Sequence, residues 1–199
     1  QIEPIQKGIK QVQVKAPADS AQLSMAWKVP RLEPGKLDSP DPYALELLTA
    51  VLDGYDNARL NRTLVKQEKV VNNIGVGYDM VSRGPELFVI SASMAKGKTV
   101  VQAQASIRKA LNELKQQGIL ESELKRIKVR ILSDQIYKRD SIFGQAMEIG
   151  TTEMAGFSWK DIDYMLDKMQ TITPEQVQAV AKKYLVDEGL TIAVLDPQA

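Results

Sequence analysis

The residue types that most often carry hydrolytic or metal chemistry are missing from this chain. Its 199 residues include no histidine and no cysteine, and zinc sites in proteins are built mainly from these side chains. Serine nucleophiles therefore lack a histidine to activate them, and no calcium-loop pattern of the form D-x-[DN]-x-[DN]-G occurs. The sequence predicts no catalytic residue, no metal and no cofactor within this chain.

Acidic residues are frequent in the second half of the sequence, but their positions indicate a structural role. The five most prominent are Glu121, Glu123, Asp161, Asp163 and Asp167. They lie in the first turns of predicted helices or near lysines, where acids are favourable without any catalysis. We interpret them as solvated helix faces.

Two short clusters have side chains that could bind a ligand. Asn72 and Asn73 stand at the start of a predicted strand, where their amides could hydrogen-bond a peptide backbone or only form a turn. Tyr78, Asp79 and Arg83 follow near the end of that strand and could line a binding chamber. The alternative for this second cluster is an ordinary solvated hairpin tip.

The elements that must position these residues come as two strands, two helices, two further strands, a block of helices and a last strand. Period-two patterns predict strands over residues 9–16, 22–29, 73–81, 86–95 and 190–195. The first two can pair as an antiparallel hairpin around residues 17–20. Helical spacing and end signals predict a helix from Ser39 or Asp41 to Gly54, then helices over residues 57–68, 99–118, 121–140, 141–155, 159–169 and 174–184.

This order of elements describes an α+β fold with a largely antiparallel sheet and helices packed on one face. A length of 199 residues suits one domain over residues 1–199. Four methionines on the late helices, Met147, Met154, Met165 and Met169, are interpreted as flexible core packing.

Composition excludes several classes of partner. Hydrophobic residues make up 44% and charged residues 26% of the chain, and its formal charge is +1, so no bulk field attracts nucleic acid or anionic lipid. Apolar runs are shorter than a membrane helix requires, and no signal peptide opens the sequence. The first residue is Gln1, which suggests a processed chain or a fragment. The compartment stays open between cytoplasm and periplasm, with the periplasm slightly favoured.

The segment from Asp53 to Gly77, DGYDNARLNRTLVKQEKVVNNIGVG, joins a glycine turn, a helix and a strand. It resembles the C-terminal half of bacterial-type pitrilysin-like (M16) zinc peptidases, and the resemblance extends over residues 11–195. It implies the M16 half-domain fold, also termed the LuxS/MPP-like metallohydrolase fold. It further implies that zinc binds to an H-x-x-E-H motif in another, N-terminal half, present in the same chain or as a separate subunit.

The resemblance also identifies a departure from active members of the family. Their C-terminal halves commonly place an Arg near the end of the second helix and a Tyr seven residues later, both directed at the peptide. Counted from the motif at residues 58–60, these positions hold Val65 and Asn72, or Lys66 and Asn73 after a slip of one residue. Lysine partly replaces arginine as a point charge. The resemblance therefore proposes Lys66, Asn72 and Asn73 for substrate contact.

The leading hypothesis is that the chain forms one wall of a chamber that holds an unfolded, extended peptide while a zinc-bearing half hydrolyses it. The parent protein would then be a zinc-dependent metallopeptidase. An alternative is a non-catalytic assembly subunit, like the family's structural relatives in respiratory and processing complexes. A third hypothesis, a small-molecule-binding domain that only shares this order of elements, would require a deep pocket within the chain.

Overall fold

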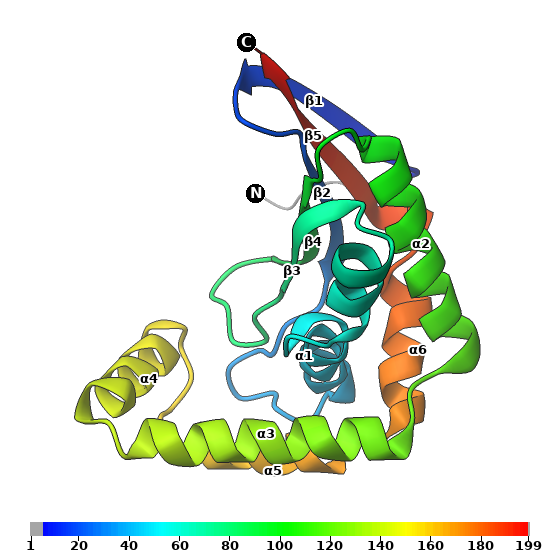
Figure 1. The fold of residues 1–199 in the computed structure, drawn as a ribbon. Coiled ribbons are helices and arrows are strands. Elements are labelled where there is room, and N and C mark those ends of the chain that lie inside the picture. The colour runs from blue at the N-terminus through cyan, green and yellow to red at the C-terminus, as the bar shows by residue number, and fades with distance from the viewer. Residues whose placement is uncertain (1–5, 199) are drawn as a thin grey trace.

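The computed structural model describes residues 6–198 and contains a five-stranded mixed sheet with helices packed on one face (Figure 1). The elements follow in the order β1 (Lys10–Pro17), β2 (Gln22–Val29), α1 (Pro40–Asp53), η1 (Asn61–Gln67), β3 (Val71–Gly77), β4 (Glu86–Met94), α2 (Val100–Gln117), α3 (Glu121–Arg139), α4 (Ile142–Met154), α5 (Asp161–Thr171), α6 (Pro174–Tyr184), η2 (Asp187–Gly189) and β5 (Leu190–Gln198). The predicted α+β class is confirmed. Of the predicted domain over residues 1–199, residues 1–5, which include Gln1, and residue 199 lie outside the described part.

The sheet has the strand order β1-β5-β2-β4-β3, with β1 parallel to β5 and the other neighbours antiparallel. The predicted hairpin between the first two strands is wrong, because β5 lies between them. The side chains of β1 are exposed along most of the strand, so burial does not fix its partner. Strand β5 instead contributes the buried Leu190 and Ile192, which pair with the buried Trp27 and Met25 of β2.

The core fills the space between the sheet and the helices α1, α2 and α6. Alternate residues of β2 and β4 face this side and are buried, as period two requires: Leu23, Met25, Trp27 and Val29, and Phe88, Ile90, Ala92 and Met94. Helix α1 adds an almost continuous run of buried side chains from Pro42 to Leu52. The predicted strands and the main helices are therefore positioned by one common apolar layer.

Local signals fix both ends of α2 as the sequence predicts, whereas the predicted N-cap of α1 does not form. Thr99 caps α2 in a reciprocal capping box with Gln102, and Gly118 ends that helix with φ of 73°. At α1, Ser39 occupies the N-cap position without a side-chain hydrogen bond. Asp41 instead accepts hydrogen bonds from Lys183 (2.8 Å) and Tyr184 (2.6 Å) of α6, so its carboxylate ties two helices together.

The second predicted helix forms with an altered geometry. Residues Asn61–Gln67 adopt a π-helix, which widens the turn that precedes β3. Leu64 is buried on its inner side, and Lys69 follows with a positive φ of 51° before the chain enters β3. This wide turn sets where the strand with Asn72 and Asn73 begins.

The second half of α3 and the whole of α4 form an arm that extends from the rest of the molecule (Figure 1). The predicted core packing of the methionines is right for Met165 and Met169, which are buried, and wrong for Met147 and Met154, which lie on the arm and are exposed. None of the helices in the described range is long and apolar enough to span a membrane.

Candidate functional site: a cavity between the sheet loop and the helical arm

The residues proposed around the start of β3 lie close together in the chain but differ in their contacts. Lys66 is exposed on η1, and Asn73 is exposed on the sheet face away from the helices. Asn72 sits where the register between β3 and β4 shifts, and its amide donates to the carbonyl of Met94 over 3.1 Å. This hydrogen bond gives Asn72 a structural role at the bulge.

The other proposed cluster lies at the opposite end of β3, roughly 20 Å away for a strand of this length. The Tyr78 hydroxyl donates to the Pro30 carbonyl over 2.7 Å, and its ring packs beside Phe88. Arg83 is exposed in the loop at residues 78–85 that joins β3 to β4. The structure therefore separates the five proposed residues into two groups and holds Tyr78 in a packed position.

One of the acids assigned to a solvated face is buried instead. Glu123 is only 8% exposed and accepts hydrogen bonds from Nε and Nη2 of Arg59, at 3.0 and 2.6 Å. The interpretation of Glu123 as a surface residue is thus wrong, because its partner lies in a distant part of the chain. Arg59 belongs to the motif on which the family resemblance rests.

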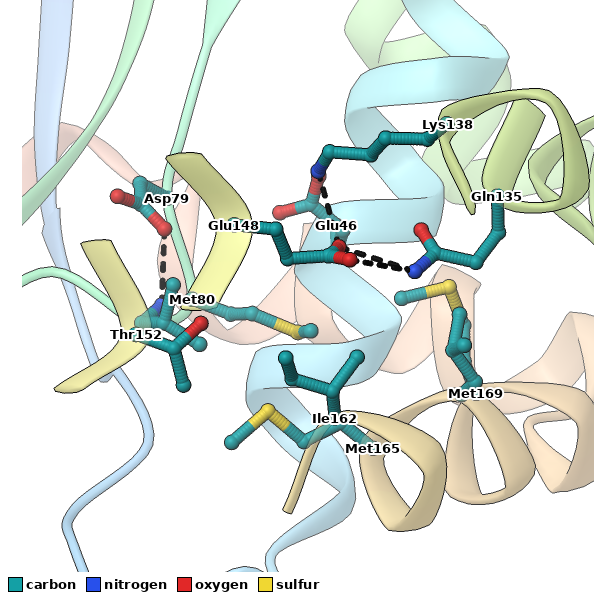
Figure 2. Close-up of a pocket in the computed structure, with 12 residues that line it drawn as sticks. Glu46, Asp79, Met80, Gln135, Lys138, Glu148, Thr152, Ile162, Met165 and Met169 are labelled. Atoms are coloured by element: carbon teal, nitrogen blue, oxygen red, sulfur yellow. Dashed lines mark hydrogen bonds and ion pairs between the residues drawn. The ribbon is translucent and has the colours of Figure 1, made fainter. Parts of the chain in front are cut away.

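A cavity of about 270 Å³ opens next to the loop that contains Asp79 (Figure 2). Five segments build it: α1, the β3–β4 loop, α3, α4 and α5. Its polar lining consists of Glu46, Asp79, Gln135, Lys138, Glu148 and Thr152, and its apolar lining of Met80, Val81, Ile162, Met165, Leu166 and Met169. Figure 2 shows the charged groups gathered on one side and the methionines and Ile162 on the other.

Two carboxylates of this cavity have different surroundings. Glu148 of α4 accepts from Gln135 (3.0 and 2.8 Å) and from Lys138 (2.9 Å), both on α3. Among the side chains of residues 6–198, none forms an ion pair or a hydrogen bond with Glu46 of α1, whose carboxylate accepts only from the Met80 backbone. Burial raises the pKa of Glu46 to about 7, the negative charges of Asp79 and Glu86 add to the rise, and the backbone of Met80 opposes it.

The groups that line the cavity can bind a ligand. In the described part of the chain no three acidic side chains converge closely enough to hold a metal ion. The carboxylates, thioethers and one amide around the space can fix a ligand by charge and packing. The search by sequence pattern missed this site, and its one local signal is Glu46, a single acid within the apolar run of α1.

A second accessible region is the sheet face that the helices leave uncovered. One row across it joins Gly75, Ser91, Ser24, Ala193 and Val12 through neighbouring strands. The hydroxyls of Ser24 and Ser91 lie 3.0 Å apart. Because these side chains are small, another surface can approach this face closely.

The arm presents apolar side chains to solvent. On α4, Ile142 is 89% exposed, and Phe143 and Met154 are each 76% exposed. At the end of α3, Ile136 is 64% exposed and Tyr137 is 73% exposed. Contiguous exposed apolar groups of this kind commonly mark protein interaction sites. The arm and the open sheet face are therefore both candidates for contact with another domain.

A mixed sheet with helices on one face and a cavity lined by carboxylates and thioethers define an α+β domain with a candidate binding site. Residues 1–130 match the family model described as "Peptidase M16 inactive domain". The chain belongs to this family, as the resemblance predicts, and such inactive domains lack the zinc site of their active counterparts. No curated protein matches the chain.

Solved structures share the fold at low sequence identity. A protease from Helicobacter pylori is 20% identical with a TM-score of 0.86, and the match covers 98% of this chain and 45% of that one. The inactive peptidase domain of a Bordetella parapertussis protein is 18% identical with a TM-score of 0.77, covering 93% and 95% of the two chains. A chain of complex III2 from Candida albicans is 17% identical with a TM-score of 0.73, covering 94% and 45%. The chain thus spans less than half of the H. pylori protease.

Proposed function

We propose that this chain is the non-catalytic half of an M16-type zinc metalloendopeptidase and forms one wall of a chamber that holds an extended peptide. The zinc-bearing half, in the same chain or as a separate subunit, carries out the hydrolysis. Membership of the inactive-domain family is the observation that carries this proposal. Zinc in the partner half supplies the activated water, while this chain supplies enclosure and binding groups.

Pairing with a second half-domain is supported by the two accessible regions described above. The arm exposes Ile142 and Phe143, and the sheet face opposite the helices has a row of small residues centred on Ser24. Both would leave water when covered by a partner, and apolar burial of this kind drives association. The H. pylori protease, more than twice as long as the matched segment, has room for a second half in one chain.

The alternative is a structural subunit without any part in hydrolysis. It is favoured by the residues at the expected Arg and Tyr positions, Val65 and Asn72, since Val65 has no hydrogen-bonding group and Asn72 is engaged with Met94. The similarity to a chain of complex III2 is consistent with such a role. In this case peptide hydrolysis by the parent protein would not depend on this domain's cavity.

The test is to combine this chain with its zinc-bearing half and to measure cleavage of unfolded fluorogenic peptides with and without a chelator. The proposed function predicts cleavage only when both halves are present, and loss of cleavage with the chelator. Equal cleavage by the zinc-bearing half alone would favour the structural subunit. Chelator-resistant cleavage by this chain alone would contradict both hypotheses.

A further inference from the structure

The cavity next to the β3–β4 loop contains a carboxylate without a cationic partner. Glu46 lines the space from α1, and among the side chains of residues 6–198 none pairs with it. Lys138 also lines the cavity, but its ammonium group is bound to Glu148 over 2.9 Å. A cation that entered from outside would therefore find Glu46 free to accept a charge-assisted hydrogen bond.

The net charge of the lining favours a cationic group. Three acids, Glu46, Asp79 and Glu148, face the space together with one base, Lys138, so the lining carries a net charge of −2 (three negative charges less one positive charge) when all four are ionised. A bare metal ion does not fit, because these acids do not form a metal-holding group. An organic cation with hydrogen-bond donors fits the separated carboxylates better.

The other wall suits an alkyl chain. Met80, Met165 and Met169 line it, and Met165 and Met169 are almost fully buried. Thioether side chains adapt their shape to an inserted group, and the methylene stems of lysine and arginine pack well on apolar surfaces. The volume of about 270 Å³ lies just below the range of about 300–1,000 Å³ typical of small-molecule sites, so it suits one long side chain.

We propose that this cavity is a subsite for a lysine or arginine side chain of the extended peptide, with Glu46 receiving the charged head and the methionines packing on the stem. The inference rests on the proposed function, because it assigns part of the peptide's specificity to the non-catalytic half. It places the specificity-determining group on α1.

Binding at this subsite depends on pH. The titratable groups that surround Glu46 come from four elements. They are Tyr78 and Asp79 in the β3–β4 loop, Glu86 on β4, Lys138 on α3 and Glu148 on α4. With a pKa of about 7 in the empty cavity, Glu46 is mostly neutral at pH 6 and mostly ionised at pH 8. Affinity for a cationic side chain therefore increases about tenfold over this interval.

The experiment measures binding of blocked peptides to the full 199-residue chain by calorimetry at pH 6 and pH 8. One peptide has a central arginine between alanines, and its matched control has norleucine instead. We expect the arginine peptide to bind about tenfold more tightly at pH 8, and this preference to disappear in Glu46→Gln. Glu113→Gln, which removes an exposed acid on α2 outside the cavity, should leave the preference unchanged.

A direct readout keeps the test independent of the folding of the variant. In the wild-type chain at pH 8, the methyl signals of Met165 and Met169 should shift at about tenfold lower concentrations of the arginine peptide than of the norleucine peptide. Unchanged signals, or equal affinity of Glu46→Gln and wild type for the arginine peptide at pH 8, overturn the proposal. Binding of free butylguanidinium as tight as that of the arginine peptide also overturns it, because the ligand would then be a small cation rather than a peptide residue.

Failure of the subsite and failure of the proposed function give different results. If the two-half enzyme cleaves arginine and norleucine peptides at equal rates, the proposed subsite is contradicted, but the proposed function of the chain as a chamber wall is not. If the chain binds no peptide and does not affect hydrolysis by its partner half, the proposed function is contradicted as well.

Discussion

Arg59 and Glu123 form a two-pronged ion pair between the turn before η1 and the first turn of α3. The two hydrogen bonds measure 3.0 and 2.6 Å, and Arg59 also donates to the carbonyl of Gly118 over 3.2 Å. Both side chains are largely shielded from water, at 23% and 10% exposure. A residue of the family motif thus fixes the start of the helix that leads to the arm.

We expect removal of one partner to cost more than a surface ion pair would. Glu123→Ala leaves a shielded guanidinium without its carboxylate, and we expect the free energy of unfolding to fall by about 2 kcal/mol. Arg59→Lys should also destabilise the chain, because lysine cannot reproduce the forked geometry. Urea unfolding of both variants measures these effects.

The exposed pair of Glu33 and Lys36 provides the control, since its oxygen and nitrogen lie 2.8 Å apart but the Lys36 and Glu33 side chains are 78% and 57% exposed. Lys36→Ala should change stability little. Equal losses for Lys36→Ala and Glu123→Ala would show that shielding does not matter for the Arg59 pair.

Glu46 should make stability depend on pH. Its pKa is raised in the folded chain from 4.5 to about 7, so the folded state binds the proton more tightly than the unfolded state. The stability that this proton confers is complete below pH 4.5 and is lost as the pH rises through 7. Glu46→Gln should therefore match wild type near pH 4.5 and exceed it at pH 8, by up to about 3 kcal/mol.

Comparison of the two proteins by urea unfolding at both pH values isolates this effect, because all other titrating groups are shared. A Glu46→Gln variant that is less stable than wild type at pH 8 would mean that the ionised carboxylate has a stabilising partner in the folded chain. The same data check that the variant is folded before any peptide is added.

The arm should contribute to association and little to folding. Ile142→Ser with Phe143→Ser removes two side chains that are 89% and 76% exposed, so the free energy of unfolding should barely change. Affinity for the zinc-bearing half should fall by about tenfold or more if these residues lie at the centre of the interface. Surface plasmon resonance with the immobilised half measures this loss.

Val101→Ser is the matched control for the arm, because Val101 is also 76% exposed but lies on α2. The affinity of the Val101→Ser variant for the zinc-bearing half should equal that of the wild-type chain. If the control weakens binding as strongly as the arm variant, the arm is not the specific contact.

The capping box of α2 gives a local stability prediction. Thr99 accepts from the Gln102 amide over 3.2 Å and its own amide donates to the Gln102 side chain over 3.0 Å. Thr99→Ala should lower the free energy of unfolding by about 1 kcal/mol. Thr99→Ser keeps the hydroxyl and should retain most of the stability, and thermal unfolding of the two variants would separate loss of the cap from loss of the methyl group.

Features that depend on neighbouring residues were predictable from the sequence. Thr99 and Gly118 bound α2 as their residue types indicate, and period-two patterns located the buried faces of β2 and β4. In each case the determining interactions lie within a few positions of the chain. The family resemblance at residues 53–77 depended on the same kind of local pattern.

Features that join distant segments were not predictable in this way. The place of β5 between β1 and β2 depends on pairing of residues more than 160 positions apart. Glu123 appeared solvated because Arg59 is 64 residues away. Likewise the cavity exists only because α1, the loop at Asp79 and three later helices meet, and no spacing along the chain encodes this meeting.

The place of β5 in the sheet also determines when the fold can be completed during synthesis. Of the five strands of this sheet, β1 is made first, but its pairing partner β5, residues Leu190–Gln198, is made after the other four. Until then β2 has one unpaired edge and β1 has no partner, and such open strand edges promote aggregation. This sheet therefore remains exposed to misassembly until β5 inserts, and disruption of β5 should cause insolubility rather than a local defect.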